Sequence, residues 1–351
     1  SVRRQVMSTE EVARGPASRA LVSPRLFAAL HEHYGIPTGA ARHDLGGSSN
    51  LNLLLGDGAR RYVVRVYRPW VTEARLADLQ LARRHLAQGG VPCAPPVPTR
   101  TGESWIRVDD RLVEVEPYVE HDAKMDSWAR LEAGLPLLGR THSLLRPLAV
   151  SAAGRNAPAA NYIPPQDVLS GTRRGIARLR EWSPSPGELQ LAAAAEELAQ
   201  LVDRAQRGIE HLPRQLVHGD YWDNNVLFRA GRVVFVGDLD FMGERARIDD
   251  LALTLYYTNS TFADDPVSDA RIHRLRGLAD AYDAGADAPL SPAERAALPV
   301  ALARTPLAFI AMIAVVDSEP GARRLAAEMM ADIAWALVIM RDLAHWQSAF
   351  A

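Results

Sequence analysis

The sequence of 351 residues contains one cysteine, Cys93, and no C-x-x-C pair. A single cysteine excludes an internal disulfide, and the missing pair removes the usual cysteine motif for zinc. The chain also lacks a net basic charge, because 40 Lys and Arg residues are balanced by 42 Asp and Glu residues. Without the positive field that nucleic-acid-binding proteins use, we predict no nucleic-acid partner.

Long apolar runs are scarce as well. The longest, LAFIAMIAVV at 307–316, is too short to span a bilayer and predicts a buried helix. The opening residues, SVRRQVMSTEEVARG, include basic residues but no apolar core, so we expect no secretory leader. These features predict a cytoplasmic protein without a membrane partner, either a monomer or a homodimer.

Hydrophobic residues make up 48% of the chain and charged residues 23%, which is typical of a globular protein. Ser23-Pro24 predicts a helix start and Gly35 its end. Short strands then follow up to residue 119, with hairpin turns at 56–58 and 109–110 and one helix over 73–87. We predict a lead-in and helix at 1–35, a small β-rich N-lobe at 36–117 and a mostly helical C-lobe at 118–351.

The C-lobe pattern is helical except for one strand-rich island, QLVHGDYWDNNVLFRAGRVVFVGDLDF, at 215–241. The predicted helices cover approximately 127–145, 166–182, 187–210, 269–285, 292–317 and 321–349. The sequence therefore predicts an α+β, bilobal fold whose polar chemistry is concentrated in the island.

Within the island, Asp220 of an H-G-D tripeptide is followed five residues later by Asn225 and, after one hairpin, by Asp238. Phosphoryl transfer needs metal ligands, a carboxylate that receives the proton of the attacking hydroxyl, and a cation on the nucleotide phosphates. Asp220 can be that carboxylate, and Asn225 and Asp238 can bind Mg²⁺ through oxygen. A second metal would need one more oxygen donor, and Asp240 is expected on the same strand face as Asp238.

The segments HGDYWDNN and VGDLDFMGERARIDDLA together resemble the aminoglycoside phosphotransferase and choline kinase superfamily, the small-molecule branch of the protein-kinase-like fold. The similarity extends from about residue 40 to residue 345. It implies a kinase that moves the γ-phosphate of ATP or GTP, with Mg²⁺, to a hydroxyl of a small molecule.

The resemblance also implies roles for individual residues. Asp220 would be the catalytic carboxylate, Asn225 and Asp238 the metal ligands, and Asp250 a structural anchor, while His218 would brace the loop. The loop over the phosphates would be GGSSNLN, and the hinge that pairs with the purine would be the segment around Pro117. These nucleotide contacts would involve Ser48, Ser49, Asn50, Glu116 and Tyr118.

One position departs from the family pattern. The third N-lobe strand often carries Lys, whereas RYVVRVY offers Arg65, which keeps the charge but presents a planar fork. A glutamate partner on the next helix is not evident, and Glu73, Asp78 and Gln80 are the candidates.

Candidates for binding the acceptor lie near the catalytic loop and on the following elements. They are Tyr221, Trp222, Asp223, Glu244, Tyr256, Tyr257 and Asp283. Several acids would suit a cationic acceptor such as an aminoglycoside, and phosphorylation of an antibiotic for resistance is one reading. A sugar, homoserine or a nucleoside antibiotic remains open as the acceptor.

Three other functions are compared with the same residues. A protein kinase would need H-R-D, D-F-G and A-P-E motifs, which the sequence lacks. A metal-dependent hydrolase would need more histidines near the island than His218. A non-catalytic nucleotide-binding module is the alternative that Arg65 favours, although the joint presence of Asp220, Asn225 and Asp238 speaks against it.

Overall fold

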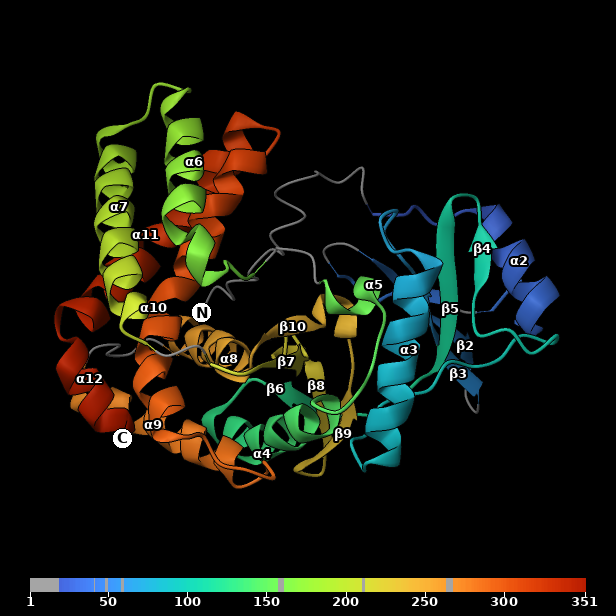
Figure 1. The fold of residues 1–351 in the computed structure, drawn as a ribbon. Coiled ribbons are helices and arrows are strands. Elements are labelled where there is room, and N and C mark those ends of the chain that lie inside the picture. Colours follow the sequence, from blue (N-terminus) through green and yellow to red (C-terminus); the bar gives the residue numbers. More distant parts are fainter. Residues whose placement is uncertain are drawn as a thin grey trace.

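The structure is a computed structural model that describes residues 19–40, 42–47, 50–57, 60–156, 161–209, 212–262 and 268–351. This part of the chain forms two lobes side by side, a smaller lobe with one antiparallel sheet and a larger, mostly helical lobe (Figure 1). The predicted α+β bilobal fold is confirmed.

The N-lobe sheet has five strands in the order β1-β2-β3-β5-β4. Its strands are β1 (Arg42–Asp44), β2 (Leu51–Asp57), β3 (Arg60–Val66), β4 (Ile106–Val108) and β5 (Arg111–Pro117). Helix α2 (Pro24–Tyr34) begins and ends as predicted, because Ser23 accepts a hydrogen bond from Leu26 N and Gly35 adopts φ 73°. Apolar side chains of α2 pack against alternate residues of β2, β3 and β5, and α3 (Glu73–Gln88) lies between the sheet and the C-lobe (Figure 1).

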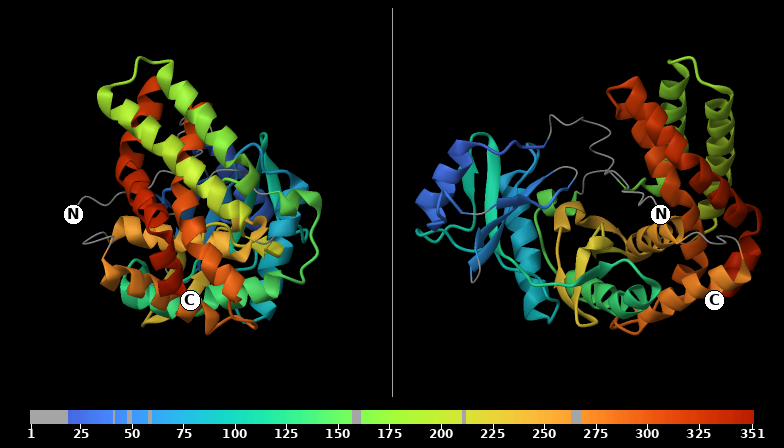
Figure 2. Two further views of the ribbon diagram at one scale, coloured as in Figure 1. Left: turned by 60° about the vertical axis from the view of Figure 1, so that its left-hand side comes forward. Right: turned by 180° about the vertical axis from the view of Figure 1, so that it is seen from behind.

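The C-lobe combines two small sheets with a group of long helices. Its strands are β6 (Ala123–Met125), β7 (Arg214–Val217), β8 (Asp223–Arg229), β9 (Arg232–Val236) and β10 (Gly243–Ala246). Its helices are α4 (Trp128–Leu145), α5 (Ala152–Arg155), α6 (Val168–Arg180), α7 (Pro186–Arg207), α8 (Arg247–Thr261), α9 (Asp269–Asp283), α10 (Pro292–Met312), α11 (Glu319–Arg341) and α12 (Leu343–Phe350). Figure 2 shows the strands and α8 between the N-lobe and the upright pair α6 and α7.

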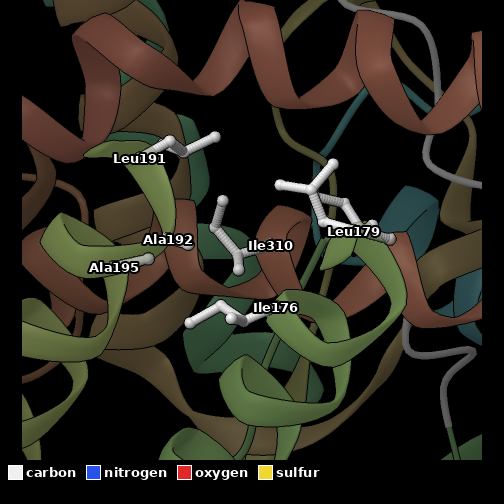
Figure 3. Close-up of a pocket in the computed structure, with 7 residues that line it drawn as sticks. Ile176, Leu179, Leu191, Ala192, Ala195 and Ile310 are labelled. Carbon is white, nitrogen blue, oxygen red and sulfur yellow. The ribbon is translucent and has the colours of Figure 1, made fainter. Parts of the chain in front are cut away.

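The core of the upright helices is closely packed. Six apolar side chains from α6, α7 and α10 meet there without leaving room for a water molecule: Ile176, Leu179, Leu191, Ala192, Ala195 and Ile310 (Figure 3). Gly175 allows α6 to approach α10 this closely, because a Cβ at that position would lie 1.9 Å from Ile310 O. Helices α6, α7 and α10 are therefore closely packed against one another at this point.

The apolar run at 307–316 lies at the end of α10 and in a following 3-10 turn. The stretch Pro292–Val315 is long and apolar enough to cross a membrane, but 83% of its most apolar window is buried inside the protein. Burial to that extent is typical of a core helix in a globular fold. The predicted buried helix is thus confirmed, although it is longer than the apolar run alone.

The helices differ from the prediction in three places. Helices α5 and α8 were not predicted, and the expected helix over 321–349 is divided at Asp342 into α11 and α12. Strand β9 also ends at Val236, so Asp238 and Asp240 are not on one strand face. Asp238 follows the strand in a left-handed conformation, and Asp240 lies in the 3-10 helix η3 (Leu239–Phe241).

Candidate active site

The loop between β7 and β8 carries the H-G-D tripeptide, and hydrogen bonds to Asp250 of α8 fix it in place. The buried carboxylate of Asp250 accepts hydrogen bonds from His218 N at 3.1 Å and Gly219 N at 3.0 Å. His142 Nε2 lies 2.9 Å from the same carboxylate. Gly219 has φ 89°, and a Cβ there would lie 2.1 Å from Phe241 O, so glycine is required at this turn.

Replacement of Asp250 by Ala is expected to destabilise the protein by roughly 3–5 kcal/mol, because buried N–H donors lose their acceptor. Urea unfolding followed by circular dichroism measures this change. Asp342→Ala removes an exposed carboxylate with no side-chain cap hydrogen bond, and should stay within about 0.5 kcal/mol of wild type. Equal stability of the two variants would show that Asp250 does not anchor the loop.

His218 is completely buried beside the loop. Its Nε2 lies 3.0 Å from Gly237 O, and its Nδ1 accepts a hydrogen bond from Asp220 N at 3.3 Å. Burial lowers the pKa of His218, which favours the neutral imidazole with its proton on Nε2. A neutral ring with both nitrogens bonded to the backbone braces the loop and has no free lone pair for an incoming hydroxyl.

Asp220 and Asn225 are directly linked. Asn225 Nδ2 donates to the backbone oxygen of Asp220 at 2.8 Å and to its Oδ2 at 3.0 Å. Burial, followed by the charges of Asp238 and Asp250, raises the pKa of Asp220 to about 7. A carboxylate with raised basicity that is fixed by an amide is suited to accept a proton.

Asp238 has φ 59° and ψ 61°, a conformation that is uncommon for a residue with a side chain. Such strained positions cluster at functional sites, where the surrounding structure enforces them. Burial acts to raise the pKa of Asp238, but the positive charges of Arg65 and Arg68 outweigh it and the pKa is lowered. Asp238 is therefore ionised and close to Asp220, whose pKa it raises.

These residues fit a divalent cation. Oδ1 of Asp238 is buried and has no hydrogen-bond donor among the described residues, although Arg65 Nη1 lies 3.2 Å away. Asn225 uses its amide nitrogen for both bonds to Asp220, and no described residue donates to its amide oxygen. Two hard oxygen donors thus remain available for a hard cation.

Asp240 is oriented differently from its predicted role as a metal ligand. It is buried, and Asn50 donates a hydrogen bond to its Oδ2. Arg68 Nη2 lies 3.7 Å from the same oxygen, and Arg65 Nη1 lies 3.8 Å from Oδ1. The carboxylate therefore joins the N-lobe to η3 of the C-lobe.

Arg65 is buried on β3 and pairs with Asp238 and Asp240. None of the three helix residues considered as its partner contacts it. Glu73 pairs with Arg107, Asp78 with Ser151, and Gln80 with Ser104 and Glu114. The negative partners of Arg65 come from the C-lobe, where sequence separation hid them.

Replacement of Arg65 by Ala should lower the thermal midpoint in Mg²⁺-free buffer, because the buried Asp240 and the partly exposed Asp238 lose a counter-charge at a cost on the order of 3 kcal/mol. Excess Mg²⁺ should restore more of the midpoint in this variant than in wild type, since the cation neutralises Asp238. Differential scanning fluorimetry with EDTA or with Mg²⁺ measures both effects, with Arg65→Lys as the charge-conserving control. An equal response of Arg65→Ala and wild type to Mg²⁺ would contradict this arrangement.

Helix α3 carries two buried arginines, Arg75 and Arg83, and not the acidic partner of Arg65 that the family pattern implies. Arg83 binds Glu114 at 2.6 Å and also pairs with Glu116, both on β5. Arg75 donates to four backbone oxygens of the C-lobe, those of Ala153, Asn156, Asp240 and Met242. The sequence analysis did not identify either arginine. Both are buried on α3 together with Leu76, Leu79 and Leu86, and an arginine placed among the apolar positions of a helix is a signal of a buried ion pair or hydrogen bond.

The predicted nucleotide contacts are only partly described. Ser48 and Ser49 lie outside the described residues, and Asn50 bonds to Asp240 and to Arg68 N. The side chain of Glu116 is bound to Arg83. The N–H of Tyr118 donates to Arg61 O at 3.0 Å, so it is already used within the sheet and is not free for a purine.

The predicted acceptor contacts divide into two groups. The Tyr221 hydroxyl donates to Gly134 O in the core, so it does not face the site, and Glu244 is exposed on β10. Trp222 packs against Tyr257, and the charge of Asp220 adds to the effect of burial in raising the pKa of Tyr257, which places both near Asp220. Asp223 begins β8 opposite Met125 with φ 35°.

Two further candidates for binding the acceptor, Tyr256 and Asp283, are bonded to other helices of the C-lobe. The hydroxyl of Tyr256 donates to Asp332 at 2.7 Å, and Asp283 pairs with Arg295.

Several known proteins resemble this chain in sequence or in fold. A family model described as "Phosphotransferase enzyme family" matches residues 41–293. A homoserine kinase of Methylocella silvestris is 26% identical over 308 residues, which cover 84% of this chain and 86% of that protein. A microcompartment-associated aminopropanol kinase superposes with a TM-score of 0.67 at 18% identity, over 92% of this chain and 98% of that one. Amicoumacin kinase hAmiN, solved with AMP-PNP, Ca²⁺ and Ami, gives a TM-score of 0.60 at 16% identity, over 84% and 88%.

Proposed function

Because the chain belongs to the phosphotransferase enzyme family, we propose that it transfers the γ-phosphate of ATP or GTP to a hydroxyl group of a small metabolite. The observation that carries the proposal is the joint placement of Asp220, Asn225 and Asp238 around one loop. Asn225 bonds directly to Asp220, and Asp238 acts on Asp220 through its charge. A proton acceptor and two oxygen ligands near one another are the parts that phosphoryl transfer requires.

In the proposed reaction, the acceptor hydroxyl lies against the Asp220 carboxylate. Its oxygen forms a bond to the γ-phosphorus while the bond from that phosphorus to the β–γ bridging oxygen breaks. The hydroxyl proton passes to Asp220, and the nucleoside diphosphate leaves. Asn225 keeps the carboxylate oriented, and the neutral His218 and ionised Asp250 keep the loop in place.

Asn225 and Asp238 would hold Mg²⁺, which when bound would neutralise charge on the nucleotide phosphates. Arg65 is the cation assigned to those phosphates, and it would exchange part of its contact with Asp238 for them. Asp240 retains Arg68 and Asn50 in this scheme. We assign the enzyme to the cytoplasm, as a monomer or homodimer.

A metabolic acceptor is favoured over an antibiotic. Eight curated relatives, each 25–28% identical to this chain, are named homoserine kinases. We therefore place small amino and hydroxy compounds first among the acceptors and drop antibiotic resistance as the leading role.

Coupled measurement of ADP or GDP release tests the function. The acceptors are L-homoserine, 3-amino-1-propanol, choline, simple sugars and an aminoglycoside, each with Mg²⁺ and either nucleotide. We expect at least one acceptor to increase release well above the rate of hydrolysis without acceptor. Folded, nucleotide-binding protein that shows no acceptor-dependent release with the whole set would refute the proposal.

A further inference from the structure

Arg245 is a buried arginine that the reaction described above does not use. It lies on β10, where the exposed Glu244 points to the opposite side, and it is 1% exposed. Its Nη2 donates to Phe241 O at 3.2 Å. Its Nη1 is buried and has no hydrogen-bond partner among the described residues, and no described carboxylate pairs with it. A buried guanidinium N–H without an acceptor is costly, so an additional acceptor at Nη1 would be stabilising.

A second buried group beside Arg245 also lacks a partner. The guanidinium of Arg245 lies 4.5 Å from the centre of the Tyr162 ring. The Tyr162 hydroxyl is buried and forms no hydrogen bond within the described part of the chain. A guanidinium N–H and a phenol O–H are both donors, and the ligand that satisfies both is an acceptor such as a carboxylate.

The charges around this pair have both signs. Arg304 approaches the Tyr162 ring at 6.0 Å and pairs with Asp249, whose negative charge adds to the effect of burial in raising the pKa of Tyr162. Arg245 forms no ion pair within the described part of the chain, although its charge acts to lower the pKa values of Asp220 and Asp250. The unpaired N–H of Nη1 suits an anionic oxygen and not a cationic group, which is the reverse of the charge preference expected from the sequence.

The pair is close to the catalytic carboxylate. Phe241 O, which accepts from Arg245, is the same atom that lies against Gly219, the neighbour of Asp220. Asn161, the residue before Tyr162, donates to Gly219 O at 2.9 Å. The charge of Asp220 acts to raise the pKa of Tyr257 and the charge of Arg245 acts to lower it, so Tyr257 lies near both residues. Arg245 and Tyr162 therefore lie beside the loop that carries Asp220, and the charge of Arg245 acts on the Asp220 carboxylate.

We propose that Arg245 and Tyr162 bind a carboxylate on the acceptor, so that the enzyme phosphorylates small hydroxy acids or hydroxy amino acids. The inference rests on the proposed function and deepens it by naming the acceptor class. The hydroxyl of the acceptor contacts Asp220, and its carboxylate accepts hydrogen bonds from Arg245 Nη1 and the Tyr162 hydroxyl.

Three probes isolate the carboxylate. L-Homoserine has both an amine and a carboxylate, 4-hydroxybutyrate lacks the amine, and 3-amino-1-propanol lacks the carboxylate. Wild-type kcat/KM should favour the carboxylate-bearing probes by at least about tenfold, the effect of losing a charge-assisted hydrogen bond. Binding is measured separately, as the shift in thermal midpoint that each probe produces with a non-hydrolysable ATP analogue present.

Two variants and one control assign the effect. Arg245→Gln should raise the KM for the carboxylate-bearing probes by about tenfold or more and remove the preference. Tyr162→Phe keeps the ring under Arg245, so it should raise that KM severalfold without lowering the thermal midpoint, because the hydroxyl has no partner to lose. Arg232→Gln removes an equal charge from an exposed position on β9, in the other small sheet of the C-lobe, and should leave the preference intact.

The outcomes separate the two proposals. A carboxylate preference in turnover or in binding that disappears in Arg245→Gln and weakens in Tyr162→Phe supports the inference. Equal or better use of 3-amino-1-propanol by wild type, or no response to any carboxylate probe, overturns the inference and leaves the kinase function standing. If Arg245→Gln does not fold, a Tyr162→Phe variant with unchanged KM or a clearly lower thermal midpoint overturns it. Failure of phosphoryl transfer to every acceptor refutes the proposed function, while the binding data still decide the inference.

Discussion

Asp220→Asn is expected to lower kcat by at least about 10²-fold while nucleotide binding stays within a few-fold of wild type. The substitution keeps the shape of the side chain and removes the charge that receives the proton. Transition states of phosphoryl transfer are often loose, so part of the loss would reflect positioning of the hydroxyl. Nucleotide binding should persist because Asn225 and Asp238 remain.

Steady-state kinetics with the best acceptor, together with fluorescence titration of a nucleotide analogue, measure these two quantities. Asp317→Asn is the control, because it makes the same change at an exposed carboxylate of the C-lobe. Normal turnover of Asp220→Asn would exclude Asp220 as the catalytic carboxylate. Loss of nucleotide binding in this variant would make Asp220 a metal ligand.

Asp238→Asn is expected to lower kcat by about 10³-fold or more, the scale of losing one charge that stabilises the transferring phosphoryl group. The amide cannot supply the anionic oxygen now facing Arg65, so Mg²⁺ would be held by Asn225 with little help. The nucleotide should also bind less tightly when Mg²⁺ is present. Kinetics over a range of Mg²⁺ concentrations measure the effect.

Asp240→Asn is the informative comparison for this prediction. Asp240 contacts Asn50, Arg65 and Arg68, so its loss should reduce the thermal midpoint more than the Mg²⁺ requirement. A steep Mg²⁺ requirement in Asp240→Asn and a normal one in Asp238→Asn would reverse the two assignments.

The candidate site could be predicted from the sequence where its parts are close along the chain. Asp220 and Asn225 are held in one loop, and Asp250 follows Asp238 within a single 3-10 turn, strand and helix start. The hairpin turn at Asp109 was equally readable, because a short polar turn between two strands is a local signal, and Asp109 has φ 54°.

Other features depended on contacts that spacing does not encode. Helix α8 was missed because its aromatic and β-branched residues are weak helix formers, yet Ile248 to Asn259 are all buried and tertiary packing decides the conformation. The partners of Arg65 lie in the other lobe. Tyr162 was visible only as part of a proline-rich loop, and its neighbour Arg245 only as a charge within a short strand.

The contacts of Arg75 have a consequence for how this enzyme can diversify. The hydrogen bonds that its guanidinium donates within the described part of the chain all go to main-chain carbonyl oxygens. Two of these oxygens belong to Ala153 and Asn156, which precede Asn161 and Tyr162 in the sequence. Mutation of side chains in that segment leaves those carbonyls in place. Substitutions near Tyr162 can therefore change which substrate is preferred while helix α3 remains bound to the C-lobe. A change of substrate need not weaken the contact between the two lobes.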